Sequence, residues 1–556
     1  MNIQNIPHQK FNIENKKDKE NIRFTGAYDA ISLGLRFLDT NQAWGANAVD
    51  LGSMVIPRTT VDFVNRGPAA GTETARREAS GTINHSLIGV YGSVAALAFA
   101  MGLNKKFGIR ADRIFADNEM YDIVGQSFHN NIQKAKANNQ DLKNPGIIKG
   151  AIGETLKDIY SNLTTNVGGE EKSLTPYQID KIVERTNNAL TNSDIDGDKI
   201  TKNTKQFLVN YITEATGSES DFKLKAFGKE TTTNLSNFVE NTYNILKTMT
   251  KKKVVEEFHR AKNFADNNFI KDIKILNNRR TILGMAIGSA VGMSIQPLNI
   301  YLTKKKTGSD GFVGVEGREK DNSFNFKLWK AGAAALFGGG IIADLARKEG
   351  GLLKNIQFKG MIPTINQFKL IYGLTIMSRF MVARDKDELR ESVVKDVLGF
   401  LNWLVLGNFV AKGVALSMDK NKMLLKNPDE TSFFKKKLKT RDEVLIEGLK
   451  RAKISSVSKD GKALKFSEML KLIPAGEAGK ALRRNLRALN IAQAAGYAYS
   501  GLVLGVGIPK LNIYMTNKSE EKRKARLAEK KALDIQTEQL QPKNIERPTM
   551  SSFGAR

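Results

Sequence analysis

The sequence predicts a mainly α-helical membrane protein that has about four to six apolar helices, an internal tandem repeat and polar helical inserts. Three observations predict this fold. A sixteen-residue segment occurs in two similar copies. Several uncharged runs approach the length that crosses a bilayer, and lysine and arginine residues flank those runs. The mean hydropathy of -0.34 and the charged fraction of 26% indicate that the apolar helices alternate with substantial water-exposed regions.

The repeated phrase reads GSAVGMSIQPLNIYLT at 288–303 and GLVLGVGIPKLNIYMT at 501–516, with eight of sixteen positions identical at an offset of 213. Each copy ends an apolar, glycine-rich run and is followed by lysine and arginine. In both halves an apolar run precedes a polar insert, and an apolar run ending in LNIYxT follows it. This order favours duplication of the whole unit. A fainter match, Arg77-Glu78 with Arg390-Glu391, precedes the first apolar run of each half.

The N-terminal residues 1–24 are rich in lysine, asparagine and glutamate and are predicted to be disordered. They lack the apolar core of a cleavable signal peptide. Residues 25–103 are predicted to hold short interfacial helices and the first apolar helix. The uncharged run 86–103 in this region has 18 residues, just enough to cross a bilayer.

Residues 104–278 form the first polar insert, and their apolar side chains recur at intervals of three and four, which predicts amphipathic helices. An apolar helical region, 279–417, follows. A lysine-rich, basic insert, 418–487, precedes the last apolar helix, 488–516, which repeats 281–303. The charged tail, 517–556, resembles a solvated helix at its start.

The uncharged run 281–302 is the strongest candidate for a span. Glycines at intervals of four lie on one face of a helix there, where the backbone of another helix can approach closely. A buried helix of a soluble core is the alternative. The glycines predicted to pack helices together in the two copies are Gly284, Gly288, Gly292, Gly501 and Gly505.

Four weaker runs complete the set: 331–346, 370–383, 397–411 and 489–508. The first contains Asp344 and the second Arg379. A charge inside a membrane is a functional candidate because it is costly to bury, although both runs are short enough for an interfacial position. Residues that are identical in the two copies of the repeat are further binding candidates: Asn299, Tyr301, Asn512 and Tyr514. A helix stop and an interfacial anchor are the simpler explanation of these residues.

No catalytic motif, cofactor motif or histidine metal site is evident, so the sequence predicts a non-enzymatic protein without a cofactor. The chain contains no cysteine, which excludes disulfides and thiolate chemistry. Asn192, Asp194 and Asp196 occupy the first ligand positions of a calcium loop. The loop pattern then fails, because Asn203 stands where a bidentate glutamate should close the shell. A solvated acidic turn is the simpler interpretation.

A net charge of +28 raises the question of nucleic acid, but the basic residues bracket the apolar runs. That distribution favours anionic lipid headgroups as partners and argues against nucleic acid. The sequence therefore predicts a multi-pass membrane protein with a scaffolding or bilayer-associated structural role. The alternatives are a transporter or channel built from repeats, and a soluble, basic, helical protein that binds nucleic acid. The sequence is also compatible with a homo-oligomer.

Overall fold

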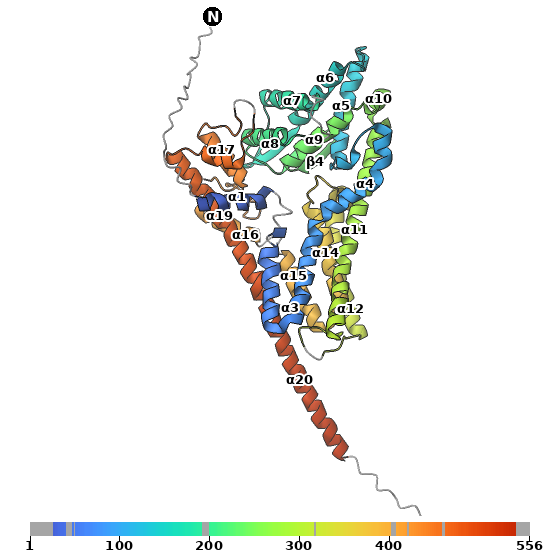
Figure 1. The fold of residues 1–556 in the computed structure, drawn as a ribbon, viewed down its shortest axis with the longest axis vertical. Helices are drawn as coiled ribbons and strands as arrows, with labels where there is room; N and C mark the ends of the chain where they lie inside the picture. Colours follow the sequence, from blue (N-terminus) through green and yellow to red (C-terminus); the bar gives the residue numbers. More distant parts are fainter. Residues whose placement is uncertain are drawn as a thin grey trace, which may run out of the picture.

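A computed structural model describes residues 26–40, 47, 48, 50–191, 200–315, 318–401, 407–419, 422–458 and 462–540. Helices make up 75% of it, which confirms the predicted mainly helical fold. Figure 1 shows a helical bundle, a second body above it that contains the sheet, and one helix that projects far beyond the bundle. The predicted disordered segment 1–24 lies outside the described residues.

The bundle begins with a hairpin inside α3 (Ile56–Ser86). At Gly67 the backbone has φ 83° and ψ 179°, a conformation that favours glycine, and Pro68 follows, so the chain reverses direction there. The first arm therefore runs down to the bend and the second returns. The other helices of the bundle are α4 (Ile88–Phe107), α11 (Asn268–Thr307), α12 (Phe324–Arg347), α14 (Ile365–Val382), α15 (Lys386–Leu401) and α20 (Ile508–Leu540).

In the described part of the chain, four helices are long and apolar enough to cross a membrane, judged by length and composition: α4, α11, α12 and the continuous segment from Glu477 into α20. At most 39% of each apolar window is buried inside the protein, so these helices present most of their apolar surface outward. Such a surface is compatible with a lipid environment. The strongest predicted run, 281–302, lies within α11, which continues through Pro297 without a break.

The glycines of α11 lie where other helices approach closely. A Cβ built on Gly284 would lie 3.1 Å from the Cα of Gly92 in α4, and one on Gly288 would lie 2.6 Å from Ile371 in α14. At Gly292 it would lie 2.3 Å from the hydroxyl of Thr375. These positions hold α11 against both α4 and α14 at a separation that larger side chains would not allow.

Substitution of Gly284 by leucine is expected to destabilise the protein by about 1–3 kcal/mol, because the backbone of α4 occupies the space that the side chain would need. Gly339 in α12 is the matched control, since a Cβ there meets nothing within 4 Å. Its replacement by the same residue, leucine, is expected to stabilise the helix by about 0.5–1 kcal/mol, because glycine is the poorer helix former. Unfolding in mixed micelles measures both; equal effects at the two sites would contradict the packing described here.

The first polar insert combines helices with an antiparallel sheet that the sequence analysis did not anticipate. The strand order is β2-β1-β3-β4, so β4 forms one edge. Phe128, Phe238 and Phe258 are fully buried in the core that the helices build against this sheet. The strands are β1 (Leu163–Val167), β2 (Glu170–Ser173), β3 (Phe222–Ala226) and β4 (Lys229–Thr233). The helices are η2 (Ala111–Arg113), α5 (Asn118–Ala137), α6 (Pro145–Ser161), α7 (Pro176–Thr191), α8 (Lys202–Thr216), α9 (Leu235–Met249), α10 (Lys252–Arg260) and η3 (Phe264–Asp266).

The second insert is shorter and packs its own small core against α16 (Gly407–Met418) and α19 (Glu477–Ser500). The two inserts touch each other: the amino group of Lys426 reaches the hydroxyl of Ser220 at 2.6 Å. The remaining helices are α1 (Gly26–Thr40), α13 (Gly351–Asn355), α17 (Arg441–Arg451), α18 (Phe466–Lys471) and two π-helical segments, η1 (Leu51–Val55) and η5 (Gly501–Gly507).

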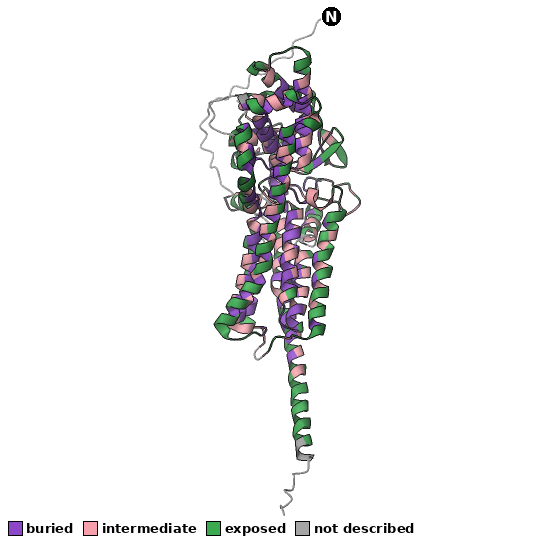
Figure 2. Cartoon of the chain, turned by 90° about the vertical axis from the view of Figure 1, so that its right-hand side faces the viewer, coloured by how far each residue is buried: buried purple, intermediate pink, exposed green. Residues whose placement is uncertain are grey.

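Residues 517–540 of the predicted charged tail continue α20 as a single helix away from the bundle, and residues 541–556 lie outside the described residues. Figure 2 shows that the projecting part is exposed, in contrast with the buried residues inside the bundle. This exposure agrees with its run of lysine, arginine and glutamate, which a solvated helix accommodates.

Candidate functional site

The interior of the bundle contains a cluster of buried ion pairs between α3, α14 and α15. At its centre, Arg379 of α14 lies 2.9 Å from Asp396 and 3.7 Å from Glu78, and Lys395 lies 3.2 Å from Glu78. Asp396 is 1% exposed and Arg379 is 5% exposed. We call these ion pairs and their buried neighbours the charge cluster.

Toward the bend of α3, the cluster continues through Arg66, whose guanidinium forms two hydrogen bonds to Glu391, one of them 2.9 Å long. Arg384 lies between Glu73 and Glu388, and it is 2.9 Å from Glu388. Fork-shaped guanidinium groups match carboxylates in this way, which offsets part of the cost of burying both charges.

Farther along, Arg318 joins three segments of the chain that are distant in sequence. Its guanidinium lies 2.9 Å from Asp385, 2.7 Å from Asp387 and 2.9 Å from Glu520 of α20. The cluster thus ties α15 and α20 together near the end of the bundle.

Toward the opposite end, Arg58 lies 3.4 Å from Glu78 and donates a hydrogen bond of 3.2 Å to the backbone carbonyl of Leu504 in η5. Asp50, which precedes η1, accepts a hydrogen bond from Thr82. The two π-helical segments η1 and η5 therefore cross at this end of the cluster. Short π-helical segments occur frequently at functional sites.

Within the part of the chain that the structure describes, some polar atoms of the cluster have no hydrogen-bond partner, although their groups are ion-paired. Nη2 of Arg58, Nε of Arg379 and Oδ2 of Asp396 are buried without a hydrogen-bond partner among the described residues. A cavity of about 30 Å³ lies beside Arg58 and Lys395, which is room for a water molecule. Of these three residues, Arg58 lines the cavity and can hydrogen-bond a water molecule there.

The two copies of the repeated phrase make the same kind of contact with the charge-bearing helices. The amide group of Asn299 donates a hydrogen bond of 2.9 Å to the backbone carbonyl of Glu73, and the Asn512 amide donates one of 3.2 Å to that of Glu391. The hydroxyl of Thr303 accepts from Arg76 at 2.7 Å, and that of Thr516 accepts from Arg390 at 2.6 Å.

The tyrosines of the repeat have the opposite environment. Tyr301 is 60% exposed and Tyr514 is 62% exposed, whereas Asn299 and Asn512 are 3% and 2% exposed. The asparagines therefore belong to the interior contacts of the charge cluster, and the tyrosines face outward from the same helices.

Replacing Asn299 by alanine is expected to cost about 1–3 kcal/mol, because the carbonyl of Glu73 and the guanidinium of Arg76 lose their buried partner. Replacing the nearby Tyr301 by alanine is expected to change stability by no more than about 0.5 kcal/mol. Denaturation of the two variants in the same detergent checks this. A cost at Tyr301 as large as that at Asn299 would contradict the assignment.

Asp344 lies apart from this cluster. Its side chain is 51% exposed and lies 3.5 Å from both Lys348 and Lys369. Of the two charged candidates in the weak apolar runs, Arg379 is thus in the buried site and Asp344 is on the surface.

The glycines of the second copy meet η1. A Cβ on Gly505 would lie 2.4 Å from the backbone oxygen of Ser53 and 2.9 Å from Pro57, whereas a Cβ on Gly501 would have nothing closer than 3.9 Å. Gly505 therefore lies in close contact with η1 and with the start of α3.

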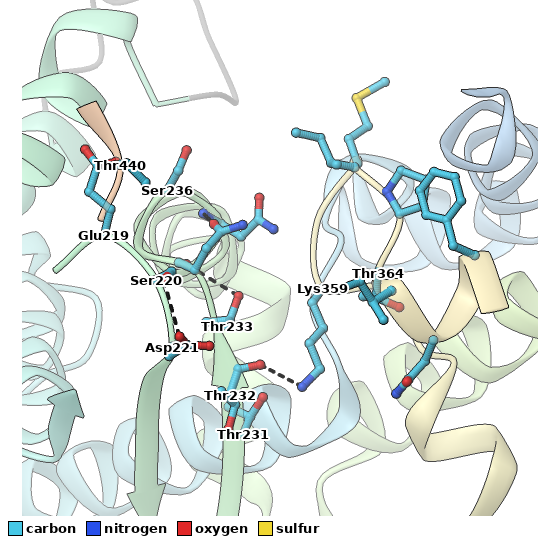
Figure 3. A pocket seen from close by; sticks show the side chains of 18 of the residues that line it. Glu219, Ser220, Asp221, Thr231, Thr232, Thr233, Ser236, Lys359, Thr364 and Thr440 are labelled. Carbon is cyan, nitrogen blue, oxygen red and sulfur yellow. Dashed lines mark hydrogen bonds between the residues drawn. The ribbon is translucent and has the colours of Figure 1, made fainter. Parts of the chain in front are cut away.

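A chamber of about 1770 Å³ opens between the bundle and the two inserts, and we call it the polar chamber. Figure 3 shows Thr231, Thr232 and Thr233 of β4 on one wall, with Lys359 across from them. The amino group of Lys359 donates a hydrogen bond of 2.7 Å to the backbone carbonyl of Thr232. Ser53 of η1 also lines this chamber, which places the crossing of the π-helical segments between the chamber and the charge cluster.

An acidic group lies where the chamber meets both inserts. Burial, together with the neighbouring carboxylates of Asp442 and Glu443, raises the pKa of Glu219 well above its usual range, although Arg36 and a hydrogen bond from Thr440 act in the opposite direction. Arg36 lies 2.7 Å from Asp442, and Lys426 lies 2.8 Å from Glu443. Glu219 therefore takes up a proton more readily than an exposed glutamate.

This raised pKa predicts a pH-dependent stability. The unfolded Glu219 loses its proton near pH 4.3, so stability is fully present below about that pH and falls as pH rises through the raised pKa of the folded state. Glu219→Gln is expected to remove this part of the slope. Thermal unfolding of both proteins between pH 4 and pH 9 measures it; parallel curves over the whole range would contradict the shift.

Among the described residues, no group of three or more histidine and carboxylate side chains could hold a metal ion. The calcium-loop candidates Asn192, Asp194 and Asp196 lie outside the described residues. Apart from Arg379 and the Arg77/Glu78 match, sequence reasoning missed the charge cluster. No family model, curated protein or solved structure matches the chain.

Proposed function

We propose that the chain is a multi-pass membrane transporter that conducts protons across the bilayer, a movement that a solute can accompany. The observation that carries this proposal is the charge cluster, whose buried carboxylates and guanidinium groups lie on α3, α14 and α15, and these helices pack against the membrane-length helices α11, α12 and α20. Ionisable groups inside a membrane are costly, and they mark ion pathways and proton relays.

The placement of the cluster supports a pathway. On the returning arm of α3 the cluster extends from Glu73 to Thr82. These residues are nine positions apart, so this stretch of helix is about 13 Å long. The polar chamber lies at one end of this stretch, beyond η1, and the bend at Gly67 lies at the other. A proton or a small ion entering from the chamber would thus meet successive buried carboxylates.

The packing of the helices supports a tandem repeat as the basis of the transporter. In the first half α11 packs against α4 and α3, and in the second half α19 packs against α16 while α20 packs against α15. The matched contacts of Asn299 and Asn512 lie in the corresponding pairs, α11 with α3 and α20 with α15. Transporters built from repeats bind their substrates between the two units, and the charge cluster occupies that position here.

A scaffolding role would rest on the apolar helices and on basic flanks that hold anionic lipid headgroups. A scaffold would need no buried ion pairs. Such pairs are costly to desolvate, and each leaves the fold dependent on both of its partners. A nucleic-acid-binding protein would likewise have no use for an outward apolar surface on four long helices. The charge cluster therefore favours transport over both alternatives.

The test has two steps. Alkaline carbonate should leave the expressed protein in the membrane pellet until detergent is added. Purified protein in liposomes that contain a pH-sensitive dye should then acidify the interior when a potassium diffusion potential, negative inside, is imposed. Asp396→Asn is expected to reduce this flux at least ten-fold, and Asp344→Asn, an exposed carboxylate, should leave it unchanged. Extraction by carbonate, or equal fluxes with and without protein, would overturn the proposal.

A further inference from the structure

The polar chamber has two chemically different walls. The first is formed by β4 and the start of α9. It begins with the oppositely charged Lys229 and Glu230 and continues with hydroxyls and amides: Thr231, Thr232, Thr233, Asn234, Ser236 and Asn237. Figure 3 shows Ser236 and the three threonines along this wall, with Thr364 and Lys359 on the opposite side. Such a wall offers many hydrogen bonds to a polar group, and its one lysine and one glutamate in β4 have opposite charges.

The ionic lining of the chamber is balanced. It contains eight basic and eight acidic side chains. Several of these pair with each other: Lys359 lies 3.3 Å from Asp117, Lys354 lies 3.3 Å from Glu119, and Lys205 pairs with Glu240. A ligand with a large net charge would have to displace such pairs, whereas a ligand of zero net charge would not.

The opposite wall contains, beside Lys359 and Thr364, an apolar patch at the end of the bundle. Met361 is 63% exposed and Ile365 is 56% exposed, and both line the chamber together with Pro363. Ile365 begins α14, and a Cβ on Gly89 of α4 would touch the backbone oxygen of Met361. This wall therefore connects the chamber with α4, one of the four membrane-length helices.

The size of the chamber also bears on its ligand. Its volume of about 1770 Å³ exceeds the roughly 300–1,000 Å³ of sites that enclose drug-sized molecules. Exposed apolar side chains are costly in water, at about 25 cal/mol per Å² of apolar surface, and an apolar chain placed against Met361 and Ile365 would remove that cost.

We propose that the polar chamber binds an amphiphile that has an acyl chain and a hydrogen-bonding head group of zero net charge. The head group lies against the β4 and α9 wall, and the acyl chain lies against Met361 and Ile365. This inference rests on the proposed transport function in one respect: it names the class of solute that the transporter would carry.

Binding can be measured without transport, on the full-length protein in a non-ionic detergent. The probe is phosphatidylethanolamine with a fluorophore on an acyl chain, which is zwitterionic, and its competitors are unlabelled phosphatidylethanolamine, monogalactosyl diacylglycerol and phosphatidylglycerol. We expect saturable binding, competition by the first two lipids, and at least five-fold weaker competition by anionic phosphatidylglycerol. Equal competition by phosphatidylglycerol, or binding that does not saturate, would overturn the proposal.

Variants locate the site. Ile365→Ser should weaken binding at least five-fold, and Leu336→Ser, at an 81% exposed position of α12 outside the chamber lining, should not change it. Thr232→Val and Ser236→Ala should weaken binding and reduce the preference over phosphatidylglycerol. Equal effects of Ile365→Ser and Leu336→Ser would assign the binding to the general lipid surface and would overturn the inference.

A separate arm distinguishes the two parts of an amphiphile. Glycerophosphoethanolamine and galactose, which lack the acyl chain, should compete at least a hundred-fold more weakly than the intact lipids. Competition at equal concentration would show a site for a free polar solute and would overturn the amphiphile. If the protein conducts protons in liposomes but does not bind the lipid, the amphiphile inference fails and the transport proposal holds. If the protein binds the lipid but does not conduct protons, only the transport proposal fails.

Discussion

Replacing Arg379 by leucine is expected to lower the free energy of unfolding by about 3–5 kcal/mol and to abolish proton flux. The guanidinium lies 2.9 Å from Asp396 and 3.7 Å from Glu78, and both carboxylates are buried. Without it, the buried carboxyl group of Asp396 loses the guanidinium that pairs with it at 2.9 Å. Unfolding in mixed micelles measures the cost, and the liposome assay measures the flux.

Arg347 provides the matched control. It is an exposed arginine in the last turn of α12, and its replacement by leucine is expected to cost only about 0.3–1 kcal/mol through its interaction with the helix dipole. The double variant Arg379→Leu, Asp396→Leu should recover part of the lost stability, because it removes both charges of the pair, but not the flux. Equal costs for Arg379→Leu and Arg347→Leu would contradict the buried pair.

Substitution of Gly505 by valine is expected to separate the two π-helical segments. The new side chain would collide with the backbone oxygen of Ser53, 2.4 Å from the position of its Cβ, and with the ring of Pro57. Neither group can rotate away, so the cost is expected to be about 1–3 kcal/mol or more. Because Ser53 lines the polar chamber and Arg58 binds η5, the displacement should also reduce flux.

Gly501 is the control for this experiment, since it lies one helical turn earlier in the same segment. A Cβ there has its nearest neighbour at 3.9 Å, an ordinary contact, so Gly501→Ala should leave flux intact and change stability by less than about 1 kcal/mol. Thermal unfolding and flux are measured for both variants to test whether the close contact at Gly505 is specific. A loss at Gly501 as large as at Gly505 would show a general intolerance of η5 to substitution instead of a specific contact.

Helical periodicity within the repeat was enough to predict which of its residues are buried. Asn299 and Thr303 are four residues apart and so share a face of α11, while Tyr301 lies two residues from each and faces elsewhere. The structure buries the first two and exposes the tyrosine. The phrase LNIYxT thus contained an inner and an outer face, and the sequence analysis treated its asparagines and tyrosines alike.

The sheet was missed for a different reason. The strands have four or five residues, and β4 reads KETTT, with little apolar content. FKLKA in β3 does alternate, and its Phe222 and Leu224 face the core. A signal of five residues inside a long stretch of helical periodicity is weak, because tertiary packing decides whether so short a segment becomes a strand.

Sequence by itself determined the mainly helical fold and the presence of long apolar helices, because both follow from local patterns of 3.6-residue period and hydropathy. Only the tertiary structure decided which charges are inside. The helices α3 and α15 carry as many charges as solvated helices do, and hydropathy cannot distinguish a carboxylate in water from one that a guanidinium neutralises. Partners such as Arg66 and Glu391 are 325 residues apart, so their contact exists only when α3 and α15 pack together.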